Sequence, residues 1–159
     1  MNIELRQVVD DWIYLRENTI AFINSLSEED LHKKLPRPGI DTFMKHFEEM
    51  CDVEQAYLDA CVSGVMEFDC VKENDEYEGL CTKEEILEKM REQDAKIEHI
   101  VNECAENSIT WDEEDVKTLN SQLRNLCIHE TLHLGQLIAF SYVMGITIPE
   151  YVVDGWALS

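Results

Sequence analysis

Four stretches of this chain carry apolar residues at the spacing of an amphipathic helix, and this pattern constrains the fold more than any other feature. They lie at about 3–25, 42–61, 82–104 and 120–144. Within each stretch apolar residues recur every three or four positions, so they share one face of a helix. A strand would instead alternate apolar and polar residues, and such alternation is essentially absent. The pattern predicts an all-α protein.

Local signals mark where the long helices begin and end. Asp41 or Thr42 is expected to cap the second stretch, because its side chain can accept a hydrogen bond from a free amide of the first turn. Thr82 and Glu85 form a capping box at the start of the third stretch. Gly145 follows the fourth stretch directly and predicts its end.

The segments between the stretches are long. The connector at 26–41 contains PRPG, which forbids a continuous helix, and Ser27 is expected to cap one short turn within it. The acidic segment 64–81 is expected to form a crossover loop. We therefore expect a four-helix bundle with long crossover connections, built as one domain from residues 1–159. The apolar tail at 146–159 is expected to pack back on the helices or onto a partner.

The charge balance excludes several classes of partner. The chain carries 13 Lys and Arg against 34 Asp and Glu, a net charge of −21. Such a surface repels phosphate backbones and anionic lipids, so we expect no nucleic-acid and no membrane partner. Acidic residues interrupt the first twenty positions, where a secretory signal needs an apolar run. Six cysteines without a CxxC pair then indicate reduced thiols in a cytoplasmic protein.

The string HETLH in the fourth stretch is the main functional signal. His129 and His133 lie four positions apart, so their imidazoles project side by side from one face of a helix. Leu126 and Leu137 place this face beside the apolar stripe, where unpaired polar groups cost free energy. A divalent cation would satisfy both imidazoles, so the spacing predicts a metal site.

His46 is the best candidate for a third ligand. It lies one turn into the second stretch on its buried side, and a bundle brings its second and fourth helices together in several topologies. No histidine follows His133, His32 lies on the connector and is expected to be solvated, and His99 flanks the apolar stripe of the third stretch and could be either core or surface. We therefore expect His46, His129 and His133 to form a three-imidazole site.

Two other metal chemistries use parts of this string. In zinc peptidases the Glu of HExxH is the general base, so Glu130 is a candidate catalytic residue, or one that orients a ligand imidazole. A peptidase also needs a sheet before this helix and a third ligand after it, and the sequence indicates neither. A di-iron site needs two facing Glu-x-x-His motifs, but Glu29 to His32 falls on the connector. Gln136 is within reach of the site, and Gly135 is expected to permit close helix approach.

The strings TFMKHFEEM, HETLHLGQL and MGITIP together resemble the DinB/YfiT-like superfamily of metal-binding four-helix bundles, over nearly the whole chain. The resemblance implies a divalent ion on His46, His129 and His133, with water at the open positions, and a homodimer. Some branches are similar to thiol-dependent S-transferases and isomerases that use a low-molecular-weight thiol such as bacillithiol or mycothiol. One departure is LIAFSYVMG, where relatives often carry a basic residue.

Two classes of function follow from a metal held by three neutral imidazoles. The ion keeps its full charge and a free position, so a bound water or thiol loses its proton near neutral pH. Zinc is the expected ion, and nickel, manganese or iron would accept the same ligands. We expect a metal-dependent S-transferase or hydrolase acting on a small molecule. The alternative is a metal- or ligand-binding bundle without turnover.

Overall fold

The computed structural model describes residues 3–158, and this part of the chain is mostly helical, which confirms the all-α class. The four long helices are α1 (Ile3–Ser25), α3 (Phe43–Ser63), α4 (Lys83–Glu103) and α5 (Leu119–Met144). The short elements are α2 (Glu28–His32), α6 (Glu150–Gly155), β1 (Ser108–Thr110) and β2 (Val116–Thr118).

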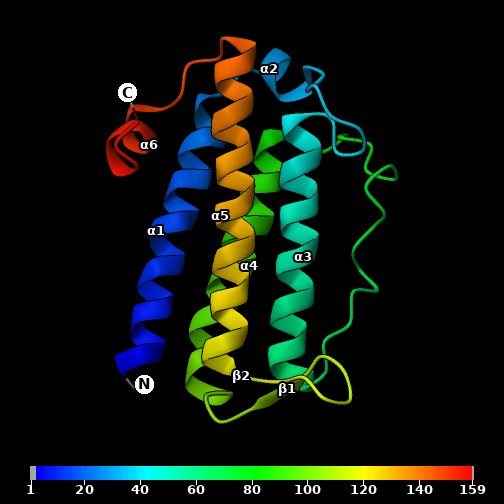
Figure 1. The fold of residues 1–159 in the computed structure, drawn as a ribbon, viewed down its shortest axis with the longest axis vertical. Coiled ribbons are helices and arrows are strands. Elements are labelled where there is room, and N and C mark those ends of the chain that lie inside the picture. The colour runs from blue at the N-terminus through cyan, green and yellow to red at the C-terminus, as the bar shows by residue number, and fades with distance from the viewer. Residues whose placement is uncertain (1–2, 159) are drawn as a thin grey trace.

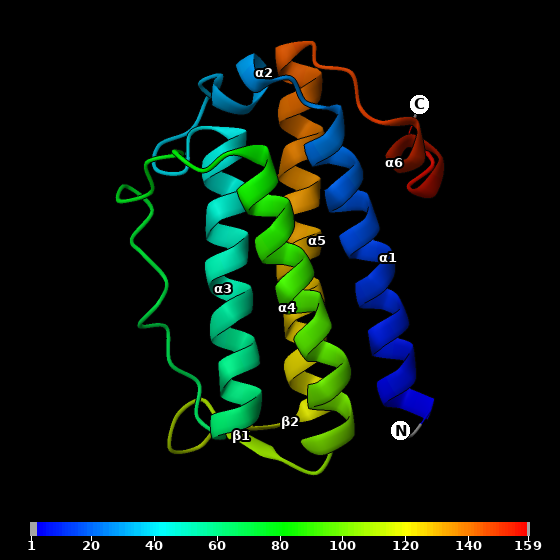
Figure 2. The same ribbon diagram turned by 180° about the vertical axis from the view of Figure 1, so that it is seen from behind.

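The long helices lie side by side, in the order α1, α5, α3 and α4 around their common axis (Figure 1). Figure 2 shows the same arrangement from behind, with α4 next to α1 and α3. The chain ascends α1 and α5 and descends α3 and α4. The loop between α3 and α4 follows α3 back over its whole length, as a crossover must when two consecutive helices are parallel.

The predicted capping signals are present where the helices begin and end. The amide of Lys45 donates to the Thr42 hydroxyl over 3.2 Å, so Thr42 caps α3. Thr82 and Glu85 form the reciprocal capping box of α4. Gly145 takes a left-handed conformation with φ of 67°, which favours glycine and ends α5.

A two-stranded hairpin, β1 and β2, closes the end of the molecule between α4 and α5, where the sequence shows no strand alternation. The strands pair antiparallel, with Ile109 opposite Lys117. Ile109 is fully buried against the helices, and the Trp111 indole in the turn donates to Gln122 over 2.8 Å. Strands of three residues are too short for an alternating pattern to appear in the sequence.

The predicted inward faces form the core between the helices. The fully buried apolar side chains of the helices include Phe22, Ile23, Phe43, Met44, Phe47, Met50, Leu58, Ile86 and Met90. All six cysteines are free thiols, and Cys51 and Cys61 are buried in this core. No helix in the described part of the chain has the length and apolar character needed to cross a membrane.

The C-terminal tail packs back on α1, one of the two expected placements. Val152 of α6 is fully buried. The indole of Trp156 donates to Asn18 over 3.1 Å, and the Tyr151 hydroxyl donates to Glu17 over 2.6 Å. These contacts hold α6 beside α1 (Figure 1).

Candidate metal centre

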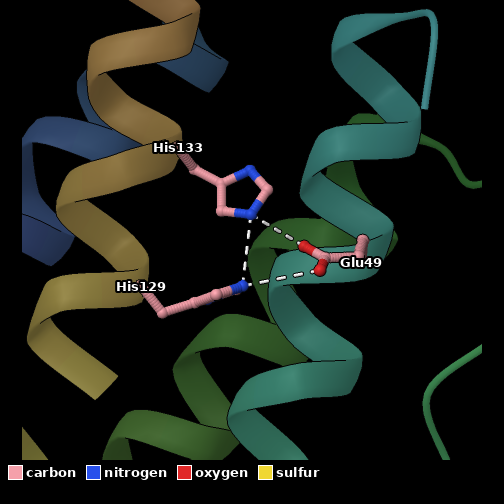
Figure 3. A group of neighbouring side chains, drawn as sticks. All are labelled: Glu49, His129 and His133. Carbon is pink, nitrogen blue, oxygen red and sulfur yellow. Dashed lines mark hydrogen bonds and ion pairs between the residues drawn. The ribbon is translucent and has the colours of Figure 1, made fainter. Parts of the chain in front are cut away.

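Two imidazoles from α5 form the base of the candidate site. His129 and His133 are one helical turn apart, and their Nε2 atoms lie 3.2 Å from each other. The ring of His133 is buried between the helices, whereas the ring of His129 is partly exposed at the edge of the same helix interface. Both Nε2 atoms point toward α3 (Figure 3).

Glu49 of α3 completes the group. Its Oε2 atom lies 2.9 Å from Nε2 of His133, and its Oε1 atom lies 3.4 Å from Nε2 of His129 (Figure 3). One ligand atom from each residue falls within 4.8 Å of the others. Two imidazoles and one carboxylate are a common ligand set for a divalent metal, so this group could hold an ion.

The separations fit a small ion. Zinc binds nitrogen and carboxylate oxygen at about 2.0–2.2 Å, so two ligands of a tetrahedral ion lie about 3.3–3.5 Å apart. The observed separations are 2.9 Å and 3.4 Å from the two Glu49 oxygens to Nε2 of His133 and of His129, and 3.2 Å between the two Nε2 atoms, so two of them would lengthen slightly around an ion. The Oε2 atom of Glu49 is buried, and its polar neighbour is Nε2 of His133 at 2.9 Å. A cation between the two would be shielded from water, which strengthens its attraction to the carboxylate.

The electrostatics keep Glu49 negatively charged. Burial by itself raises the pKa of Glu49, but the imidazoles of His129 and His133 outweigh burial and lower it to about 2. The carboxylate is therefore ionised at neutral pH, as a metal ligand must be.

His46 contacts His133 at the edge of the imidazole ring that faces away from Glu49. Its Nδ1 atom lies 3.0 Å from Nδ1 of His133, the ring nitrogen that faces away from Glu49. The His46 side chain is fully buried, and burial, together with His133 and Arg37, lowers its pKa to about 3. A neutral His46 can accept the Nδ1 proton of His133 and fix the orientation of that ring. The structure thus brings His46 to His133 but not into the group with Glu49.

A basic residue reaches this region from the connector before α3. Nη1 of Arg37 donates to Oε1 of Gln136 over 2.9 Å and lies 3.5 Å from Nε2 of His46. Within residues 3–158, no carboxylate lies at ion-pair distance from Arg37, whose Nε donates to the carbonyl of Pro38. The sequence of α5 lacks a basic residue after Gln136, and Arg37 brings one there from another segment.

Glu130 lies away from the site, which corrects the expectation of a role beside the histidines. Successive residues of a helix are rotated by about 100°, so Glu130, which follows His129, points toward α1. Its side chain is buried, accepts a hydrogen bond from Thr19 and lies 3.4 Å from Nη1 of Arg16. Glu130 contacts neither histidine, so this geometry gives it no role as a general base.

Arg16 gathers three carboxylates from three other helices. It pairs with Glu54 of α3, Asp94 of α4 and Glu130 of α5. Burial alone would lower the pKa of Arg16, but these carboxylates raise it, so the guanidinium stays charged. Removing one partner of such a network leaves an uncompensated buried charge. The network explains why Glu54 lies on the apolar face of α3.

The remaining sequence candidates lie elsewhere. His32 and His99 are exposed on α2 and α4. The expectation that Gly135 permits close helix approach is wrong, because a Cβ atom added there would meet nothing within 4 Å in the described structure. Sequence reasoning missed Glu49, although its position three residues after His46 on the same helix was a usable signal.

The fold and the site together define a helical protein with a candidate centre of two histidines and one glutamate. No known family model matches the chain, and no curated protein matches it significantly.

Proposed function

We propose that this chain is a divalent-metal-dependent enzyme with a DinB/YfiT-like four-helix bundle fold. The observation that supports this most directly is the convergence of Glu49, His129 and His133 at separations suited to one ion. Three protein ligands leave a fourth position open, which distinguishes reactive zinc sites from structural ones.

Zinc is the expected ion, and nickel, manganese or iron would accept two imidazoles and a carboxylate. Such an ion, when bound, lowers the pKa of a water or thiol at the open position and so supplies a nucleophile near neutral pH. The substrate would be a small molecule, and the reaction an S-transfer to an electrophile or a hydrolysis.

Arg37 favours a substrate or thiol with an anionic group. Its guanidinium is half-buried and lies beside His46, and among residues 3–158 its hydrogen-bond partners are neutral. A carboxylate on a low-molecular-weight thiol would form a charge-assisted hydrogen bond with it. The strongly acidic surface would otherwise repel such an anion, so Arg37 would select it.

A cytoplasmic homodimer is part of the same proposal. The outer face of α5 exposes Ile128, Leu132 and Val143 one after another along the helix. Exposed apolar side chains that line one helix face are typical of a contact with another chain. The net charge of −21 argues against nucleic acid and membranes as partners.

A metal-binding protein without turnover is the second candidate. It is favoured by the limited access to the site, since the side chains of His133, Glu49 and His129 are 5%, 13% and 19% exposed. A substrate would have to approach from the His129 side.

A conjugation and hydrolysis assay separates the two candidates. Protein stripped with a chelator and reloaded with zinc would be tested on a panel of thiols with an electrophilic dye, and on activated esters. If the chain is an enzyme, turnover should require the metal. Turnover should then be lost in Glu49→Gln and kept in the neighbouring control Glu48→Gln. In Arg37→Gln the preference for an anionic thiol over a neutral one should disappear. Stoichiometric metal binding without turnover on the whole panel would instead support the second candidate.

A further inference from the structure

A groove of about 520 Å³ lies between α1 and α4, which are neighbours in Figure 2. Its walls are largely apolar, with Trp12, Ile13 and Ile20 on α1 and Ile97 and Val101 on α4. The volume falls in the range of about 300–1,000 Å³ that is typical of small-molecule sites. It shares no lining residue with the candidate metal centre.

The charges of the groove are mostly negative. Asp94 lies in its lining, and Glu17 and Glu98 are exposed lining residues. The basic residue of the lining, Arg16, is buried and already pairs with Glu54, Glu130 and Asp94. An organic anion would therefore meet three carboxylates without a free counter-charge, whereas an organic cation would meet two carboxylates, of Glu17 and Glu98, and a third, of Asp94, that it shares with Arg16.

Asp94 has the geometry to receive a cation. Its Oδ1 atom accepts from the Trp12 indole over 2.9 Å and from Nε of Arg16 over 3.2 Å. Both contacts use the same oxygen, and the side chain remains 29% exposed. Burial raises the pKa of Asp94, and the neighbouring Arg16 and Trp12 offset this only in part.

We propose that the groove between α1 and α4 binds a small organic cation, with an apolar body against Trp12 and Ile97 and an ammonium group at Asp94. A second copy of this chain is a poorer occupant, because a symmetric contact through this groove would bring Glu17 and Glu98 against like charges. The site is independent of the proposed metal chemistry.

The test uses three probes of similar size and different charge: 2-phenylethylammonium, 2-phenylethanol and 3-phenylpropanoate. The protein is kept in excess chelator, so the outcome does not depend on the metal centre. Binding is followed by the indole N–H signals in a two-dimensional NMR spectrum. Trp12 lies in the groove, while the indoles of Trp111 and Trp156 donate to Gln122 and Asn18 and serve as internal controls.

The proposal predicts saturable movement of the Trp12 signal alone, with the ammonium bound about tenfold more tightly than the alcohol and the carboxylate bound most weakly. The double variant Glu17→Gln/Glu98→Gln should weaken the ammonium by roughly two- to fivefold per carboxylate, without disturbing the buried Arg16 network. Because Glu17 also accepts a hydrogen bond from Tyr151 of α6, Trp111 alone is the internal control for this variant. The matched control Glu84→Gln/Glu92→Gln removes the same charge from exposed positions of α4 outside the groove and should change nothing.

Three results would overturn the proposal. One is equal affinity for all three probes, and another is an ammonium effect that is the same in both double variants. The third is a Trp12 signal that shifts with protein concentration and does not change when a probe is added. Such a result would mean that a second copy of the chain covers the groove.

Discussion

Nε2 of His133 lies 2.9 Å from Oε2 of Glu49, which joins an imidazole of α5 to a carboxylate of α3. Neither residue can be placed near the other from local sequence alone. The contact depends on the order of the helices, in which α5 lies between α1 and α3 (Figure 1). It is also what turns a pair of histidines into a candidate metal centre.

Glu49 and its neighbour Glu48 offer a matched pair of substitutions. Glu48 accepts hydrogen bonds from the backbone amides of Gly79 and Cys81 and so holds the crossover loop. We expect Glu49→Gln to weaken zinc binding by at least about 100-fold, since even residues that only orient a ligand cost about 10–100-fold. Glu48→Gln should leave zinc affinity within about threefold and lower the stability of the fold instead. Competition with a chromophoric chelator measures the affinity, and equal losses in the two variants would contradict the assignment.

His46 tests whether a third imidazole binds the ion or orients one that does. Because His46 meets the outward Nδ1 of His133, His46→Gln should weaken zinc binding by about 10–100-fold, less than His133→Gln does. Absorption spectra of the cobalt-substituted protein should keep their shape in His46→Gln. A loss as large as that of His133→Gln, with a changed spectrum, would instead make His46 a direct ligand.

Helix periodicity predicted the four long helices, their caps and the position of the crossover loop, because these depend on local spacing and on single capping side chains. Local spacing could not supply the partner of the buried Glu54, because Arg16 comes from another helix. Glu49 and Arg37 were missed for the same reason. In the string FEEM, Glu49 stands out only by its spacing of three residues from His46, and it is the packing of α3 against α5 that brings it to His133 while Glu48 binds the crossover loop.

Burial of a neutral imidazole predicts how stability depends on pH. The folded pKa of His46 is about 3, below the ordinary value of 6.5, so the unfolded chain binds a proton that the folded chain does not. The contribution of the buried, neutral His46 to the free energy of unfolding is therefore fully present above pH 6.5. This contribution is lost as the pH falls toward 3, by up to about 1.4 kcal/mol per pH unit. Urea unfolding of metal-free protein between pH 5 and 7 should show a shallower dependence in His46→Gln than in the wild type. Parallel curves would contradict the buried, neutral state.

Gly135 offers a test of the exposed face of α5. It lies inside the helix with open space around its Cα, so Gly135→Ala should raise the free energy of unfolding by about 1 kcal/mol. Thermal and urea unfolding of the metal-free protein would measure the gain. A destabilised variant would mean that another chain or a ligand approaches this position closely.

The central claim is that α3 and α5 hold a divalent ion between Glu49, His129 and His133. Elemental analysis of protein purified without a metal-affinity tag tests it most directly. The claim predicts about one equivalent of a first-row divalent metal per chain, reduced to a small fraction in Glu49→Gln and His129→Gln and retained in Glu48→Gln. A wild-type protein that carries no metal, and that takes up none from a zinc buffer, would contradict it.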